Sequence, residues 1–135
     1  MIQRLDDKIW VSGQVAPAEV GGLVAQGVTM LINNRPDGEE VGQPFAGDVE
    51  EAAARAGIAY RFVPIGRGIG PADVEAMQEA IAAAGDGRLL AFCRSGTRSA
   101  MVAALAMREE GRSNDEVTGC LTEAGFDPGP IAHLL

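Results

Sequence analysis

The segment best suited to chemistry is Cys93-Arg94-Ser95-Gly96-Thr97-Arg98-Ser99. It follows a short apolar run at residues 89–92, typical of a buried strand, and precedes an apolar stretch with helical spacing at residues 99–110. A loop that leads from a strand into a helix gathers unpaired backbone N–H groups and the positive end of the helix dipole. The sequence therefore predicts a small anion-binding cradle with a cysteine at its mouth.

Cys93 and Arg98 are the residues that we expect to be catalytic. The helix terminus and the two nearby arginines favour the nucleophilic thiolate of Cys93 over its thiol. Arg98 offers a planar fork of N–H donors to an oxyanion, and Ser99 is placed to hydrogen-bond the sulfur. Gly96 permits the tight curvature of the loop. The residues expected to bind the substrate are Arg94, Ser95, Gly96, Thr97, Ser99 and Arg67.

The distribution of charge singles out the same segment. The 135 residues include 11 Lys and Arg against 19 Asp and Glu, a net charge of −8. Such acidity argues against nucleic acid and anionic membranes as partners. Residues 87–108, however, contain four arginines and neither Asp nor Glu. This acid-free window favours a functional thiolate and a small anionic substrate over an ordinary core cysteine.

The elements that must position this loop alternate between strand and helix. Strands are predicted at residues 8–11, 28–32, 58–63 and 89–92. Helices are predicted after Pro17, at residues 48–56, after Pro71, at residues 99–110 and after the capping box at residues 113–116. This order predicts one α/β domain over residues 1–135, a three-layer sandwich of about four mostly parallel strands with helices on both faces.

Composition also predicts the setting of the protein. No apolar run approaches the roughly 18 residues of a membrane span, and the first residues lack the pattern of a signal peptide, so we expect a cytoplasmic protein. The two cysteines, Cys93 and Cys120, have no zinc-site spacing, and we expect thiols rather than a disulfide. Neither a metal nor a cofactor is predicted.

Polar residues elsewhere allow two interpretations each. Arg67, in the glycine-rich connection at residues 65–70, either binds an anionic substrate or is an ordinary exposed arginine. Asn33, Asn34 and Arg35, after the second predicted strand, either line the pocket or serve as turn residues.

Two further side chains could contribute, although each has a simpler structural explanation. Cys120 is either a resolving thiol for Cys93 or a small core side chain, and the core position is favoured. His133, the one histidine of the chain, has no metal-like partner nearby in the sequence and is read as a surface or docking residue.

The Cys93 loop resembles the active-site loops of two families, the rhodanese-type sulfurtransferases and the cysteine-dependent phosphatases of the tyrosine and dual-specificity class. Residues 9–14, 27–34 and 60–65 are in addition similar to the phosphatase-like domain of beta-lactamase hydrolase-like proteins, a similarity that extends over roughly residues 3–130. The resemblance implies a dual-specificity-phosphatase-like fold. Because that domain also occurs fused to metallo-beta-lactamase-fold enzymes of persulfide metabolism, it implies such an enzyme as a partner.

Three departures from the phosphatase pattern bear on the reaction. Four residues rather than five separate Cys93 from Arg98, which tightens the cradle around a three-oxygen phosphoryl group. Phe92 stands where these phosphatases usually have a histidine. Residues 64–68 read Pro-Ile-Gly-Arg-Gly, without the aspartate that would act as the general acid.

The missing acid favours sulfur transfer. Expulsion of an alkoxide from a phosphate ester benefits from proton donation, typically by 10²–10⁴-fold, whereas thiolate or sulfite leaves sulfur without it. We therefore expect a sulfurtransferase in which Cys93 carries a persulfide. Two alternatives stay open: a phosphate monoester hydrolase with Asp37 or Asp73 as a substitute acid, and a module that binds an anion or a persulfide without turnover.

Overall fold

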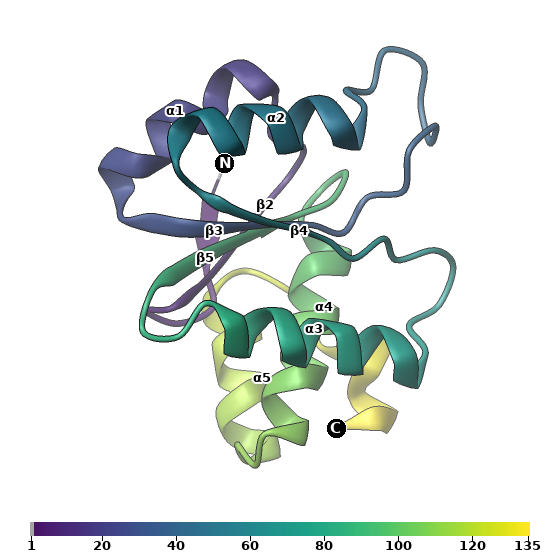
Figure 1. The fold of residues 1–135 in the computed structure, drawn as a ribbon. Coiled ribbons are helices and arrows are strands. Elements are labelled where there is room, and N and C mark those ends of the chain that lie inside the picture. The colour runs from purple at the N-terminus through teal and green to yellow at the C-terminus, as the bar shows by residue number, and fades with distance from the viewer. Residues whose placement is uncertain (1) are drawn as a thin grey trace.

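The computed structural model describes residues 2–135 as a five-stranded sheet with helices on both faces (Figure 1). The strands are β1 (Ile2–Arg4), β2 (Ile9–Ser12), β3 (Val28–Asn33), β4 (Ala59–Phe62) and β5 (Arg88–Phe92). Their order is β1-β2-β5-β3-β4, with β1 antiparallel to β2 and every other pair parallel. The predicted α/β class and the mostly parallel sheet are confirmed.

The count of about four strands was one too low. The missed strand, β1, is a three-residue edge strand of sequence Ile-Gln-Arg. It is too short to show the alternation of apolar and polar residues by which a strand is recognised. Its position is fixed by antiparallel pairing with β2, the next strand along the chain.

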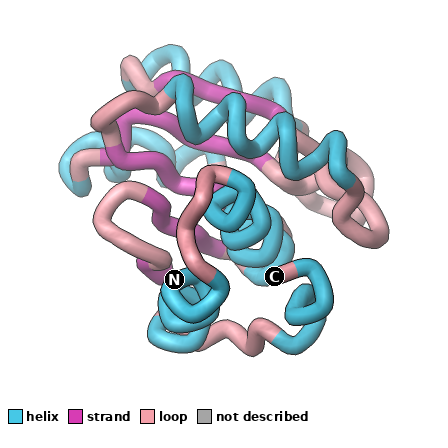
Figure 2. Tube along the Cα trace, turned by 90° about the horizontal axis from the view of Figure 1, so that it is seen from below, coloured by secondary structure: helices cyan, strands magenta, loops and turns pink. Residues whose placement is uncertain are grey.

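The helices form two layers (Figures 1 and 2). On one face lie α1 (Val20–Leu23), between the 3₁₀ turns η1 (Pro17–Glu19) and η2 (Val24–Gln26), and α2 (Ala46–Ala56). On the other lie α3 (Pro71–Ala83), α4 (Thr97–Glu109), α5 (Asn114–Glu123) and the 3₁₀ segment η3 (Gly129–Leu134). Within residues 2–135, no helix is both long and apolar enough to cross a bilayer.

The helix expected after Pro17 is only partly α-helical. Four residues are α-helical and the turns on either side are 3₁₀. Two of those four are Gly21 and Gly22, and glycine is a poor helix former because its backbone loses more entropy on ordering.

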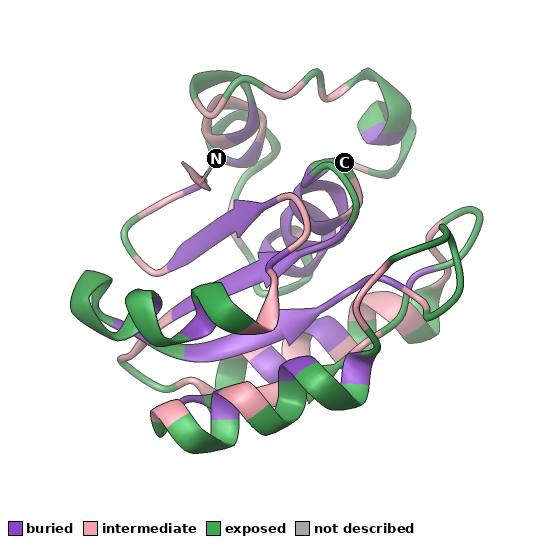
Figure 3. Cartoon of the chain, turned by 90° about the horizontal axis from the view of Figure 1, so that it is seen from above, coloured by how far each residue is buried: buried purple, intermediate pink, exposed green. Residues whose placement is uncertain are grey.

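The sheet separates two hydrophobic cores, and its central strands are buried on both sides (Figure 3). Along β5, Leu89 and Ala91 face α3–α5, whereas Leu90 and Phe92 face α1 and α2. Helix α4 is buried continuously from Ser99 to Met107. Because both β5 and α4 lie in the interior, the loop between them is held firmly at each end.

Leu31→Ala should test how much the core under α1 and α2 contributes. Leu31 is fully buried in β3, and a cavity there should lower the free energy of unfolding by about 2–5 kcal/mol in urea denaturation. Val41→Ala is the matched control, because Val41 is fully exposed. If Leu31→Ala lowers the free energy of unfolding no more than the control does, the burial of Leu31 is contradicted.

Candidate active site

Cys93 directly follows the central strand β5, at the carboxyl edge of the parallel sheet. Its backbone N–H donates to the carbonyl of Ser12 at the end of β2, at 3.3 Å. The neighbouring carbonyl of Phe92 accepts from the N–H of Asn34, which follows β3, at 2.8 Å. Cys93 is therefore fixed between the ends of β2 and β3, and only 1 % of it is exposed.

The loop after Cys93 turns back over the sulfur. The N–H of Gly96 donates to Cys93 Sγ at 3.1 Å, the kind of contact that stabilises a thiolate or a persulfide anion. Gly96 has φ +94°, and a Cβ there would lie 3.3 Å from the carbonyl carbon of Ser12. Both facts explain why glycine is needed at this position. Helix α4 begins at Thr97, two residues earlier than predicted, so Arg98 lies in its first turn.

The fork of Arg98 is occupied by a carboxylate of the same chain. Its Nη1 donates to Glu39 Oε2 at 2.7 Å and its Nη2 to Glu39 Oε1 at 2.8 Å. Nη1 also donates to the carbonyl of Ile65, at 2.8 Å. The hydrogen bonds that Arg98 donates to Glu39 raise the pKa of Arg98. The sequence predicted a fork for an oxyanion, and Glu39 shows that a planar oxyanion fits it.

Two more arginines complete an ion-pair cluster, which we define as Arg35, Arg94, Arg98, Glu39 and Glu40. Arg35 Nε donates to Glu39 Oε1 at 2.9 Å, and Arg94 Nη2 donates to Glu40 Oε2 at 3.0 Å. Arg35 also reaches Glu40, at 3.5 Å. The hydrogen bond from Arg98, against an opposing effect of burial, lowers the pKa of Glu39 from 4.5 to about 2. Glu39 is therefore a carboxylate at neutral pH.

Sequence reasoning missed Glu39 and Glu40. Both lie in the polar loop after β3, at residues 34–45, in which the sequence drew attention to Asn34, Arg35 and Asp37 instead. The signal that could have found them is topological, because loops that follow neighbouring parallel strands meet at one edge of the sheet.

Ser99 does not bond the sulfur as the sequence suggested. Its hydroxyl donates to Asn34 Oδ1 at 2.8 Å, and both side chains are buried. Asn34 Nδ2 in turn donates to the carbonyl of Val63, after β4, at 3.0 Å. Ser99 and Asn34 therefore join α4 to the ends of β3 and β4, and their role here is to hold the edge of the sheet together.

The two aspartates considered as substitute acids each bind the backbone at the start of a helix. Asp37 Oδ1 accepts from the N–H of Ala46, the first residue of α2, at 2.8 Å. Asp73 Oδ2 accepts from the N–H of Gly70, just before α3, at 2.8 Å. Both contacts are of the kind that stabilises helix N-termini.

The remaining predicted residues are more open to solvent. Ser95 and Thr97 are exposed on the outer side of the loop, with 3.4 Å between their hydroxyl oxygens. Arg67 is exposed, and no carboxylate of residues 2–135 pairs with it. Cys120, on α5, is partly buried, and this burial raises the pKa of its thiol. Cys120 is thus not activated as a thiolate.

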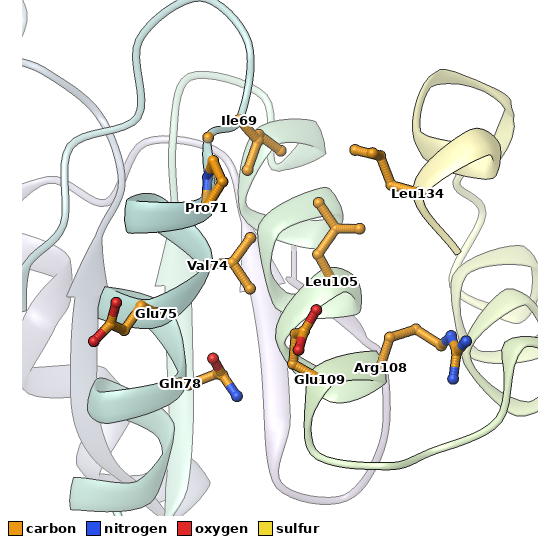
Figure 4. Close-up of a pocket in the computed structure, with 10 residues that line it drawn as sticks. Ile69, Pro71, Val74, Glu75, Gln78, Leu105, Arg108, Glu109 and Leu134 are labelled. Carbon is orange, nitrogen blue, oxygen red and sulfur yellow. The ribbon is translucent and has the colours of Figure 1, made fainter.

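Two cavities lie along α4, beside the loop. One, of about 470 Å³, borders the Arg98 side of the cradle. Its lining is Gly68, Ile69, Ser95, Thr97, Arg98, Met101, Pro130, Ile131, His133 and Leu134. The other, of about 590 Å³, lies farther along α4, where Val74 of α3 faces Leu105 (Figure 4). Cys93 lines neither cavity, so the nucleophile lies in the cradle and outside both of them.

A family comparison agrees with this geometry. Residues 2–109 match the family described as beta-lactamase hydrolase-like protein, phosphatase-like domain. The chain belongs to this family. The resemblance noted in the sequence is thereby confirmed, and the fold is that of cysteine-dependent phosphatases.

Longer relatives share the same region. A beta-lactamase hydrolase-like protein of Xylella fastidiosa (strain Temecula1) is 44% identical over 131 residues, which are 95% of this chain and 30% of the relative. A protein of the same name from Agrobacterium fabrum is 39% identical over 110 residues, 81% of this chain and 25% of the relative. The chain thus spans less than a third of the curated relatives that it matches.

Solved structures show the same architecture. A candidate phosphatase from Neisseria meningitidis Z2491 superposes with a TM-score of 0.80 at 29% identity, over 98% of this chain and 94% of that one. Kinase associated phosphatase, with its catalytic cysteine changed to serine, superposes with a TM-score of 0.75 at 16% identity, over 93% and 83% of the two chains. This second likeness concerns the fold alone.

Glu39→Gln should change how stability depends on pH. Because the pKa of Glu39 is about 2 when folded and 4.5 ordinarily, its ion pairs stabilise the protein above about pH 4.5 and are lost as the pH falls toward 2. Between about pH 5 and about pH 2, the free energy of unfolding of the parent should therefore fall by about 1 kcal/mol more than that of the variant, a value reduced for solvent screening.

Urea denaturation at a series of pH values measures this difference. Glu51→Gln serves as the control, because Glu51 pairs with Arg55 on the exposed face of α2. Identical pH dependence for the parent and Glu39→Gln would contradict the ion-pair cluster.

Proposed function

We propose that Cys93 accepts sulfane sulfur as a persulfide and passes it to a thiol. The thiolate attacks the outer sulfur of a donor R–S–SH, so that an S–S bond to Cys93 forms, the donor S–S bond breaks and R–S⁻ leaves with the electron pair. An acceptor thiolate then attacks the outer sulfur of the Cys93 persulfide and regenerates the Cys93 thiolate. No external oxidant or reductant is consumed.

The observation that carries this proposal is the state of the carboxyl groups around the cradle. Glu39 accepts hydrogen bonds from Arg98 and Arg35, Asp37 accepts from the N–H of Ala46, and Asp73 accepts from the N–H of Gly70. Each candidate donor of a proton to an alkoxide leaving group is thus already engaged elsewhere. Sulfur transfer needs no such donor, because thiolates are weakly basic leaving groups.

The cradle itself suits a small, singly charged adduct. Cys93 Sγ receives one backbone N–H, from Gly96, within the short loop that precedes Arg98. A terminal persulfide sulfur is smaller than a phosphoryl group and carries a single charge, so it needs fewer donors. A metallo-beta-lactamase-fold enzyme is the partner that the family resemblance implies.

Phosphate monoester hydrolysis is the second candidate, and the fold favours it. In that reaction the Cys93 thiolate would form a bond to phosphorus, the P–O bond to the alcohol would break, and water would release phosphate from the phosphocysteine. Both candidates use the same nucleophile and place an anionic adduct beside the start of α4.

Mass spectrometry separates the two reactions. After incubation with glutathione persulfide, the parent should gain about 32 Da, one sulfur atom, on the peptide that contains Cys93, and a thiol acceptor should remove it. Cys93→Ser should gain nothing, and Cys120→Ser is the matched control that should behave as the parent. An adduct on Cys120 alone would contradict the proposal.

Phosphatase activity has its own signature. Release of phosphate from an aryl phosphate that depends on Cys93, without sulfur labelling, would establish the second candidate instead. If Cys93 reacts with an alkylating agent at neutral pH and binds anions but turns over neither substrate, the domain is a binding module.

A further inference from the structure

We propose that Glu39 is a charge filter that sets donor specificity, favouring an organic persulfide over dianionic donors such as thiosulfate. The inference rests on the proposed function and names the substrate class of the same site. It starts from an unusual feature of the cradle, in which the arginine fork expected to receive a substrate oxyanion already holds a carboxylate of the chain.

The end-on fork of Arg98, formed by its two terminal nitrogens, is already filled, and within residues 2–135 only its Nε–H and one Nη2–H are left over. Both terminal nitrogens donate to Glu39, and Nη1 donates in addition to the carbonyl of Ile65. A sulfonate or phosphoryl group could therefore bind the end-on fork only by displacing the carboxylate, and at the two remaining N–H groups it would lie beside the negative charge of Glu39. A persulfide donor, which carries no oxyanion at the reacting sulfur, needs no such displacement.

Glu39 is held against displacement from several sides. Arg35, which is only 2 % exposed, donates to its Oε1 at 2.9 Å. The backbone N–H of Glu39 donates to Gln43 Oε1 at 3.0 Å, and Gln43 Nε2 donates to the carbonyl of Pro36 at 2.8 Å. The loop that carries the carboxylate is thus braced internally, and moving Glu39 would break contacts besides those with Arg98.

The charges of the cluster are nearly balanced before any substrate binds. Three arginines face the carboxylates of Glu39 and Glu40, and the thiolate of Cys93 that the proposed reaction requires would add a third negative charge. A dianion would therefore enter a site without surplus positive charge and would meet Glu39 at short range. At the effective dielectric of a protein surface, one extra unit charge a few ångströms away costs enough to change an affinity by about tenfold or more.

The reactions with thiosulfate and with an organic persulfide differ in the negative charge that they bring next to Glu39. With thiosulfate, the Cys93 thiolate attacks the outer sulfur, the S–S bond breaks and sulfite leaves as a dianion, so two negative charges remain beside Arg98 and Glu39 throughout. With R–S–SH, the outer sulfur is uncharged at the moment of attack and the leaving R–S⁻ bears one charge. The charge of Glu39 therefore disfavours the reaction with thiosulfate more than the reaction with an organic persulfide.

Glu39→Gln tests the filter, because the amide keeps the shape and an acceptor oxygen for Arg98 while removing the charge. We expect kcat/KM for thiosulfate, relative to that for glutathione persulfide, to rise by about tenfold or more. Glu51→Gln, on the far surface of α2, is the matched control and should leave the ratio unchanged. If kcat/KM falls by the same factor for both donors, Glu39 only positions Arg98, and the charge filter is overturned.

A binding measurement keeps the inference separate from the proposed function. Inorganic sulfate should protect Cys93 from iodoacetamide in Glu39→Gln at a concentration about tenfold lower than in the parent. If this shift occurs but no donor labels Cys93, the sulfurtransferase proposal fails and the filter stands. If donors label Cys93 yet neither the ratio nor the protection changes, the filter is wrong.

Discussion

The site depends on the parallel pairing of β5 with both β2 and β3. This pairing brings three chain segments to one edge of the sheet: the turn after Ser12, the polar loop after Asn33 and the loop that begins at Cys93. Hydrogen bonds from Cys93 N–H to Ser12 and from Asn34 N–H to Phe92 extend the ladder beyond the strands. The chemistry is therefore positioned by backbone bonds of the interior, where local motion is most costly.

Burial of α4 makes the second half of this framework. Because Ser99 to Met107 are all buried, between the sheet and the helices α3 and α5, the first turn of the helix cannot tilt without opening a core. The hydrogen bond between Ser99 and Asn34 adds a polar link inside that core, at the point where Arg98 emerges. A polar contact at this depth is worth more than one at the surface, since its loss would leave two buried groups unpaired.

How far the sequence predicts this molecule depends on whether the decisive contact is local. The strand, loop and helix around Cys93 could be predicted, because apolar periodicity, Gly96 and the helix start all lie within a short segment. Glu39 could not, since its contact with Arg98 joins residues 59 positions apart and no local pattern marks it. Ser99 was placed correctly but given the wrong partner, for the same reason.

The filled fork and the engaged carboxyl groups have a common physical origin. In an acidic chain, an arginine cluster at a helix start attracts carboxylates of its own loops as readily as it attracts substrate anions. Here Glu39 and Glu40 meet that attraction, and their loop is long enough and braced well enough to hold them there. The same carboxylate that neutralises Arg98 is kept ionised by it, so it cannot donate a proton to a leaving group. This ion pair thus occupies the end-on fork of Arg98 and keeps Glu39 from acting as an acid, whereas the hydrogen bond from the Gly96 N–H to the Cys93 sulfur does not involve it.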